Sequence, residues 1–221
     1  ILALTATATP KVIEDVQDKL LFRERNVLKT SFRRENLIYA VKYSENKDRD
    51  VIEMVKKLKG NGIVYVRSRR KSVEIARYLV QEGISAAYYH AGLEHQARNE
   101  AHQNWTIGKI RVIVATNAFG MGIDKADVRF VIHADLPDSP EAYFQEAGRA
   151  GRDGNKSFAI LLSSPSDQAA VSHRILVNFP DNTTIKNTYS ALGNYLQIPV
   201  GSGKGASYDF DINDFARVYR L

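Results

Sequence analysis

Short apolar runs alternate with amphipathic stretches along most of the chain. Gly62–Val66 is a β-branched run of the kind that forms a strand buried on both faces. The next stretch, Ser72–Gln81, places its apolar residues at helical spacing and is followed by Gly83, a common residue just after a helix. A strand followed by a helix is the repeating unit of a parallel sheet, so this pattern predicts β-α units.

The same pattern continues through the following hundred or so residues. Four more apolar runs predict strands, at Ser85–Tyr89, Arg111–Ala115, Arg129–His133 and Phe158–Leu162. Helices are predicted at His95–Trp105 and Ser139–Arg149, where Pro140 suits the first turn because that position needs no backbone N–H. We therefore predict an α/β fold, a doubly wound open sheet that is mainly parallel, over residues 31–165.

Two flanking regions differ from this pattern. Residues 1–30 predict a strand at Leu2–Leu4 and a helix from Thr9 to Leu20, which is typical of the tail of a preceding α/β domain. The chain lacks an initiator Met, so we interpret it as part of a longer protein, with Asn26–Tyr39 as a connector. Residues 166–221 predict a helical linker and the start of a further module, with helices to Val177, over Thr184–Leu196 and over Ile212–Leu221, and a flexible loop at Gly201–Gly205.

The composition narrows the classes of protein that the chain can represent. With 44% hydrophobic and 25% charged residues among 221, it has the make-up of a folded globular protein. The absence of Cys excludes a disulfide scaffold, a thiolate nucleophile and a zinc site with Cys ligands, and it favours a reducing compartment, the cytoplasm. No apolar run approaches the roughly 18 residues of a membrane span, so no membrane partner is expected. The net charge of +6 is compatible with a polyanionic partner but does not identify one.

The stretch Glu141–Gly154 holds the densest chemical information in the sequence. Arg149 ends the predicted helix, Arg152 follows three residues later, and both lie among glycines such as Gly151. One guanidinium group can bind two phosphoryl oxygens at once, and it stays charged. Glycines let a phosphate-bearing ligand approach the backbone. The same residues also fit a helix end with arginines that face solvent. The spacing alone leaves both interpretations open.

This stretch and several others resemble the motifs of superfamily 2 helicases. Gln145–Gly154 resembles motif VI, and together with Phe119–Asp124 it resembles the RecQ branch of that superfamily. The other similarities follow the family's order along the chain: Thr5–Thr7 for motif III, Ile63–Arg69 for motif IV, Tyr89–Leu93 for the segment after it and Val114–Asp124 for motif V. The resemblance covers most of the chain.

The resemblance implies the second RecA-like domain, of P-loop NTPase type, in an ATP-dependent helicase that unwinds DNA 3′ to 5′ in recombination or repair. Arg152 would be the arginine finger that reaches the γ-phosphate of ATP, a group worth about 10³- to 10⁵-fold in turnover in related nucleotidases. Arg149 would lie beside it on the phosphates. Gln145, on the helix before them, would link the motif to the nucleotide and to the facing domain.

On the ribose side, the resemblance implies that Asp124 accepts a hydrogen bond from ATP, and that Gly120 and Gly122 bring the backbone close to the nucleotide. Taken alone, Asp124 fits an ordinary turn carboxylate equally well. In this family the phosphate loop and the Mg²⁺ ligands belong to the first RecA-like domain, and neither is present here; Gly201–Gly205 has Gly where such a loop needs Ser or Thr. The ATP site is therefore expected to be composite, and this chain alone should not hydrolyse ATP.

By the same resemblance, residues that follow three of the predicted strands would hold single-stranded DNA, and DNA forks in the whole protein. Such grips use phosphate contacts, and open parallel sheets bind ligands at the carboxyl ends of their strands. The candidates are Ser68, Arg69, His90, Ala91, Gly92, Thr116 and Asn117. His90 also fits a hydrogen-bonded loop histidine, and Arg70 and Lys71 fit a solvated, charged turn, so among the basic residues we single out Arg69.

Thr5 and Thr7 would couple this domain to the preceding RecA-like domain of the same protein, although threonines here also fit ordinary helix capping. RecQ proteins commonly carry a zinc subdomain with four Cys, and the absence of Cys predicts no zinc site in this chain. The other histidines lack metal-ligand spacing and are expected to be structural; they are His95, His102, His133 and His173.

Two alternatives stay open. A DEAD-box-like RNA helicase shares the fold and the two arginines, whereas the sequences of Phe119–Asp124 and Gln145–Gly154 favour RecQ. A non-catalytic module that binds nucleic acid belongs to a different class, and it predicts that Arg152→Ala leaves function intact. The expected location is the cytoplasm, in association with the nucleoid if the source is bacterial.

Overall fold

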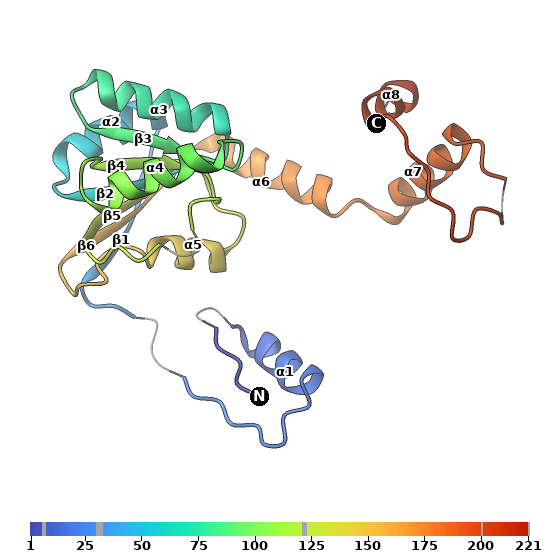
Figure 1. The fold of residues 1–221 in the computed structure, drawn as a ribbon, viewed down its shortest axis with the longest axis horizontal. Helices are drawn as coiled ribbons and strands as arrows, with labels where there is room; N and C mark the ends of the chain where they lie inside the picture. The colour runs from blue at the N-terminus through green and yellow to red at the C-terminus, as the bar shows by residue number, and fades with distance from the viewer. Residues whose placement is uncertain (6–7, 30–32, 121–122, 200, 221) are drawn as a thin grey trace. The chain divides into compact units, whose positions relative to one another are not determined.

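A six-stranded sheet, parallel throughout, forms the centre of residues 37–163 (Figure 1). The computed structural model describes residues 1–5, 8–29, 33–120, 123–199 and 201–220. The strands are β1 (Leu37–Tyr43), β2 (Asn61–Tyr65), β3 (Ala86–Tyr89), β4 (Val112–Ala115), β5 (Val128–His133) and β6 (Ser157–Ser163), in the order β1-β6-β5-β2-β4-β3. Because every strand runs the same way, all the carboxyl ends meet at one edge of the sheet. The predicted α/β fold is confirmed, and the sheet is wholly parallel.

Helices cover both faces of this sheet because alternate residues of each buried strand point to opposite faces. Val64 of β2 packs in the layer under α2 and α3, and its neighbour Ile63 packs in the layer under α4 and α5. Both side chains are fully buried. The helices are α2 (Lys47–Lys57), α3 (Arg69–Gln81), α4 (His95–Thr106) and α5 (Pro140–Ala147).

Large aromatic side chains fill the space between the layers. Trp105 of α4 and Phe130 of β5 are fully buried. The Phe130 ring lies so close to Gly62 that a Cβ built on that glycine would be 2.0 Å from a ring carbon. Gly62 is therefore required in β2 because any side chain would displace Phe130.

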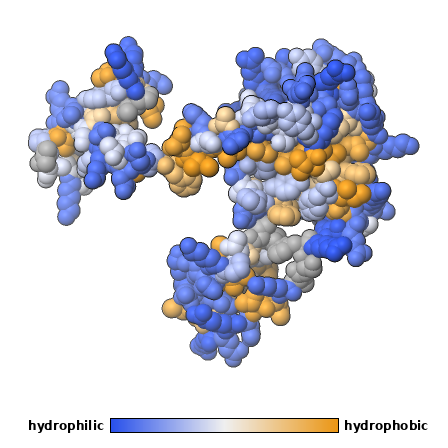
Figure 2. All heavy atoms as spheres, turned by 180° about the vertical axis from the view of Figure 1, so that it is seen from behind, coloured by the Kyte–Doolittle hydropathy of each residue, from blue (hydrophilic) through white to orange (hydrophobic). Residues whose placement is uncertain are grey.

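The five predicted strands and the helices between them are all present, with ends that differ by a few residues at most. The prediction missed β1 and α2, and the expected connector Asn26–Tyr39 runs into β1. β1 is an edge strand, and Val41 and Tyr43 are 70% and 61% exposed, so it lacks the buried apolar pattern of the central strands. Figure 2 shows that apolar side chains also reach the surface elsewhere. In α2 only Val51 and Val55 are buried. Charged residues surround this narrow apolar stripe, so the sequence gives a weak signal for the helix.

The N-terminal region contains the predicted helix but not the predicted strand. α1 (Pro10–Lys19) begins where expected, and the Thr9 side chain accepts a hydrogen bond from the Val12 backbone N–H. Leu2 and Leu4 lie outside any strand, and their side chains are 80% and 85% exposed. A strand needs a neighbour to satisfy its backbone groups, and none of the described strands pairs with these residues.

The chain divides into two compact units, Ile1–Ser164 and Pro165–Leu221, and the elements described in the second are all helices. It contains α6 (Pro165–Asn178), α7 (Asn182–Tyr195) and α8 (Ile212–Tyr219). Tyr195 packs edge-on against the Phe215 ring, and its hydroxyl donates to Asp214 Oδ2 at 2.9 Å, which ties α7 to α8. No helix among the residues described is both long and apolar enough to cross a membrane.

Candidate functional site

The predicted site residues follow the carboxyl ends of the strands. Ser68 and Arg69 come after β2, His90 comes directly after β3, and Thr116 comes directly after β4. Parallel strands bring these positions to one edge, which is where open α/β sheets bind ligands. The loop after α5, with Arg149 and Arg152, and the segment before β5 form a second group of predicted residues.

Arg152 and Asp124 lie in direct contact although 28 residues separate them in sequence. Arg152 Nη1 donates to Asp124 Oδ1 at 3.0 Å and to the backbone carbonyl of Ile123 at 2.9 Å. The Asp124 side chain is 93% exposed and that of Arg152 is 38% exposed. Water screens an ion pair of this kind, so an anionic ligand can compete for the guanidinium at little cost.

Arg149 lies against the backbone of the other predicted nucleotide segment. A Cβ built on Gly120 would be 3.1 Å from Arg149 Nη2, so the absence of a side chain at Gly120 makes room for this guanidinium. Arg149 Nε is buried and has no hydrogen-bond partner among the described residues. Arg149 therefore retains hydrogen-bonding capacity of the kind that a phosphate oxygen would satisfy. Gly122 lies outside the described residues.

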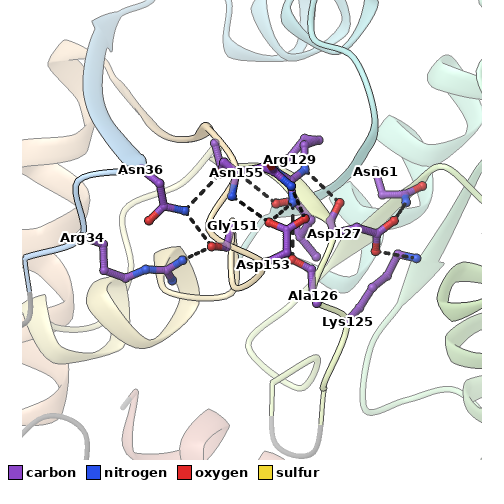
Figure 3. A network of polar contacts seen from close by, with 12 residues as sticks. Arg34, Asn36, Asn61, Lys125, Ala126, Asp127, Arg129, Gly151, Asp153 and Asn155 are labelled. Atoms are coloured by element: carbon purple, nitrogen blue, oxygen red, sulfur yellow. Dashed lines mark hydrogen bonds and ion pairs between the residues drawn. The ribbon is translucent and has the colours of Figure 1, made fainter.

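The loop that bears both arginines is fixed at Gly151 (Figure 3). The Gly151 N–H donates to the carbonyl of Val128 at 2.8 Å. Its carbonyl accepts from Asn36 Nδ2 at 2.7 Å and from Arg34, which also donates to the carbonyl of Gly148 at 3.1 Å. Gly151 has φ +65°, and a Cβ there would lie 2.6 Å from Asn36 Nδ2. Glycine is therefore required at this position for both backbone conformation and space.

A row of charged side chains fixes the far end of the same loop (Figure 3). Arg129 Nη2 donates to Asp153 Oδ1 at 2.6 Å, and Asp153 also accepts from the backbone and side chain of Asn155. The hydrogen bonds from Arg129 and Asn155 hold the pKa of Asp153 well below its ordinary value. Next to them, Asp127 accepts from Asn61 Nδ2 at 2.8 Å and pairs with Lys125. The segment before β5 and the loop after α5 are thus held as one piece.

Gln145 and the two threonines contribute less to this picture. Gln145 lies exposed on α5, one turn before the arginine loop. Thr5 is exposed in the N-terminal region, and Thr7 lies outside the described residues. The predicted roles of Gln145, Thr5 and Thr7 stay predictions.

Three of the predicted nucleic-acid residues form a group of their own. A Cβ built on Gly92 would be 2.9 Å from Arg69 Nη1 and 3.3 Å from His90 Nδ1, so all three meet at one point. The His90 ring stacks on Tyr88 with centroids 5.8 Å apart. Ala91, between His90 and Gly92, is exposed. This group presents a cation and an imidazole beside bare backbone, a combination suited to phosphate contacts.

The carboxylates nearby distinguish Arg69 from the basic residues next to it. Arg70 Nε pairs with Glu74 at 2.7 Å. Lys71 pairs with Asp48 and Asp135; burial lowers the pKa of Lys71, but these two carboxylates outweigh it and the net pKa is raised. No carboxylate among the described residues pairs with Arg69.

The remaining predicted nucleic-acid residues have structural contacts. Ser68 Oγ accepts from the Lys71 backbone N–H at 3.4 Å and caps α3, which leaves its hydroxyl proton to donate. Thr116 is 7% exposed, and its backbone N–H bonds the carbonyl of Tyr89. Asn117 is exposed and lines a pocket of about 100 Å³ together with Arg67, Asp135 and Glu146.

The sequence analysis missed two sets of residues that shape this site. Arg34 and Asn36, which hold the arginine loop, lie in the segment expected to be a connector. The second set is Tyr65, His133 and Glu146, in which the buried Tyr65 and His133 rings stack and His133 contacts Glu146. The sequence analysis expected His133 to be structural but did not connect it with Tyr65 or Glu146; the signal is a polar group at the end of each of two buried strands. Among the described residues, no cluster of His, Asp and Glu could hold a metal ion.

Comparisons with known proteins identify the family that the chain resembles. Residues 46–154 match the helicase conserved C-terminal domain. The chain is 46% identical over 168 residues to the ATP-dependent DNA helicase RecQ of Bacillus subtilis, covering 76% of this chain and 28% of that protein. It is 43% identical over 203 residues to the RecQ-like DNA helicase blm-1 of Caenorhabditis elegans, covering 90% of this chain and 20% of that protein. The chain thus spans under a third of the length of these relatives.

Among solved structures, the fold resembles that of the Escherichia coli DEAD-box protein SrmB, in a crystal structure with the regulator of ribonuclease activity A. The two are 31% identical with a TM-score of 0.55, and the match covers 63% of this chain and 83% of that one. A DEAD-box protein from the hyperthermophile Methanococcus jannaschii is 26% identical with a TM-score of 0.58, covering 77% of this chain and 47% of that one.

Proposed function

The chain belongs to the RecQ family of helicases, and we propose that it acts as the second motor domain of an ATP-dependent 3′-to-5′ DNA helicase within a longer protein. Its substrates would be single-stranded DNA and DNA forks, and its activity would serve recombination or repair in the cytoplasm, on the nucleoid if the source is bacterial. ATP would be used with Mg²⁺, whose ligands we expect in the preceding RecA-like domain.

The contact between Arg152 and Asp124 supports this proposal most directly. It joins a residue of the arginine loop to the segment before β5, and Arg149 meets the same segment at Gly120. The proposed roles need these residues on one side of one nucleotide, with arginines on its phosphates and a carboxylate on its ribose. The bonds at Gly151 and Asp153 support a fixed geometry for this group before any nucleotide binds.

In this proposal the two arginines have different starting positions. Arg149 already lies against Gly120, and its guanidinium would bind a phosphate oxygen from this position. Arg152 is bonded to Asp124, so it would exchange this carboxylate for the γ-phosphate when the two motor domains close. Charge that develops during phosphoryl transfer is what such a guanidinium stabilises.

The group Arg69, His90 and Gly92 would hold one DNA strand through its phosphates, without reading its bases. Closure around ATP and its release would then move this grip along the strand relative to a grip on the preceding domain.

The test is ATP hydrolysis by the full-length protein with single-stranded DNA or RNA added, comparing wild type with Arg152→Ala. We expect stimulation by DNA and a loss of turnover of about 10³-fold or more in the variant, with DNA affinity nearly unchanged. Arg49→Ala is the matched control, because Arg49 is an exposed arginine in an ion pair on α2, outside the proposed site. The isolated 221-residue chain should show no ATP hydrolysis.

The other outcomes separate the alternatives. Stimulation by RNA alone would move the protein to the DEAD-box-like RNA helicases, a reading that the structural similarity to DEAD-box proteins keeps in view. Full activity of Arg152→Ala would refute its assigned role, and the absence of any ATP hydrolysis would favour a non-catalytic module.

A further inference from the structure

The hydroxyl of Tyr65 lies at the junction of the two proposed nucleotide segments. Tyr65 ends β2 and is 3% exposed, and its hydroxyl donates to the carbonyl of Phe119 at 2.7 Å. A phenol has a single proton to donate, so this bond leaves only oxygen lone pairs for other neighbours. A second partner of this oxygen must therefore be a donor.

The guanidinium of Arg149, which lies against Gly120, is the neighbouring group that can supply this donor. Burial raises the pKa of the Tyr65 hydroxyl, while the charge of Arg149 and its hydrogen bond to the hydroxyl act in the opposite direction. The same guanidinium lies against Gly120, the residue that follows Phe119. One hydroxyl thus contacts both the backbone that leads into Gly120 and the side chain that packs on Gly120.

A second set of contacts fixes the tyrosine itself. The Tyr65 ring stacks on the His133 ring, with centroids 5.4 Å apart and planes 19° apart. His133 is fully buried, and its Nε2 is 2.9 Å from Glu146 Oε2. Glu146 lies near the end of α5, three residues before Arg149, so these two contacts join β2, β5 and the end of α5.

We propose that Tyr65 is a positioning residue for Arg149: its hydroxyl anchors the Phe119 carbonyl and accepts from the guanidinium, which aims the remaining N–H groups at a phosphate oxygen of ATP. This inference rests on the proposed function, because it presumes that Arg149 contacts the nucleotide. It adds a residue of β2 that makes no contact with the ligand.

The test is Tyr65→Phe in the full-length protein, with Tyr143→Phe as the matched control. Phenylalanine keeps the ring and its stacking on His133, so the fold is retained. Tyr143 packs on the same histidine, with centroids 4.9 Å apart, and loses the same single oxygen in the control. We expect Tyr65→Phe to lower kcat for ATP hydrolysis about tenfold, since a misplaced catalytic group loses rate, with KM for ATP within about twofold of wild type. Tyr143→Phe should match wild type.

A double-mutant cycle with Arg149→Lys separates positioning from general support of the fold. Lysine keeps the charge and loses the planar fork, so Tyr65 has no guanidinium to orient. We expect Tyr65→Phe to cost less than about twofold in this background, because residues that act through one another are not additive.

Equal losses in both backgrounds, or a Tyr65→Phe protein as active as Tyr143→Phe, would overturn the positioning role while DNA-stimulated hydrolysis by wild type still supported the proposed function. A wild-type protein without ATP hydrolysis would overturn both.

Discussion

The two groups of site residues along the carboxyl edge of the sheet are built in different ways. The loop after α5 is fixed through backbone carbonyls and buried or paired side chains, from Arg34 and Asn36 at one end to Arg129 at the other. In the group at Arg69 and His90 the two side chains meet at Gly92 and the His90 ring stacks on Tyr88, but no ion pair with another described residue holds the Arg69 guanidinium. Chemistry on a phosphate requires groups held to within a fraction of an ångström, whereas a sequence-independent grip on a strand tolerates movement. The difference therefore matches the two tasks proposed for this edge.

Gly151→Ala should have the largest effect on stability, because Gly151 lies at the centre of the fixed loop. The new Cβ would meet Asn36, Ser157 and the carbonyl of Asn155, and the backbone is already in the left-handed region. We expect a loss of about 3 kcal/mol or more in the free energy of unfolding, measured by urea denaturation of the chain.

Gly154→Ala is the matched control within the same loop. Gly154 also has a positive φ, +82°, but a Cβ there meets nothing within 4 Å. The expected cost is the backbone term alone, about 1 to 2 kcal/mol. Equal losses in the two variants would show that the contacts around Gly151 do not stabilise the loop.

Arg69→Ala tests the looser group, where we expect a moderate effect on binding and little on stability. Removal of one phosphate contact should lower the slope of log affinity against log salt for single-stranded DNA by about 0.7. Fluorescence anisotropy with a labelled oligonucleotide over a salt series measures this slope. Arg70→Ala is the control because Arg70 is engaged with Glu74, and it should keep the wild-type slope. An equal decrease of this slope in both variants would contradict the prediction that Arg69, and not Arg70, contacts a phosphate.

The smallest expected effect concerns the pH dependence of the stability that Asp153 gives to the fixed loop. Hydrogen bonds from Arg129 and Asn155 lower the pKa of Asp153 in the folded chain, whereas an unfolded Asp titrates near about 3.9. A lowered folded pKa stabilises the chain above the unfolded pKa, and this contribution is lost as the pH falls from about 5 towards 2.

Asp153→Asn should therefore unfold more easily at pH 6 and lose less stability between pH 6 and pH 3 than wild type does. Urea midpoints at the two pH values measure this difference. Parallel losses in the two proteins would show that Asp153 does not contribute to the acid sensitivity.

Much of the fold could be predicted from the sequence because the central strands are buried on both faces. Short apolar runs such as Gly62–Val66 and Arg111–Ala115 are typical of such strands. β1 escaped prediction because an edge strand with exposed residues has no such run, and Leu2–Leu4 shows the converse, an apolar run without a partner strand. The local pattern of apolar residues therefore predicts a strand well only where both faces of the strand are buried.

The candidate site was only partly predictable, for a different reason. Family resemblance suggested Arg149, Arg152, Asp124 and the glycines around them as site residues, and their roles stay predictions. The contacts of Arg34 and Asn36 with Gly151 span 117 and 115 residues, and no local signal relates such distant positions. In the sequence Tyr65 resembled an ordinary core residue, because its ring is buried in the core. Only the folded structure shows that its hydroxyl bonds the carbonyl of Phe119.

The position of Arg34 and Asn36 just before β1 also has a mechanical consequence. Both side chains donate hydrogen bonds to carbonyls of the arginine loop. Both residues lie in the segment that leads from the N-terminal region into β1. Tension applied to the chain ahead of Arg34 would reach Gly148 and Gly151 through a few hydrogen bonds before it loaded the ladder between β1 and β6. A pull on this stretch would therefore act directly on the loop that bears the arginines.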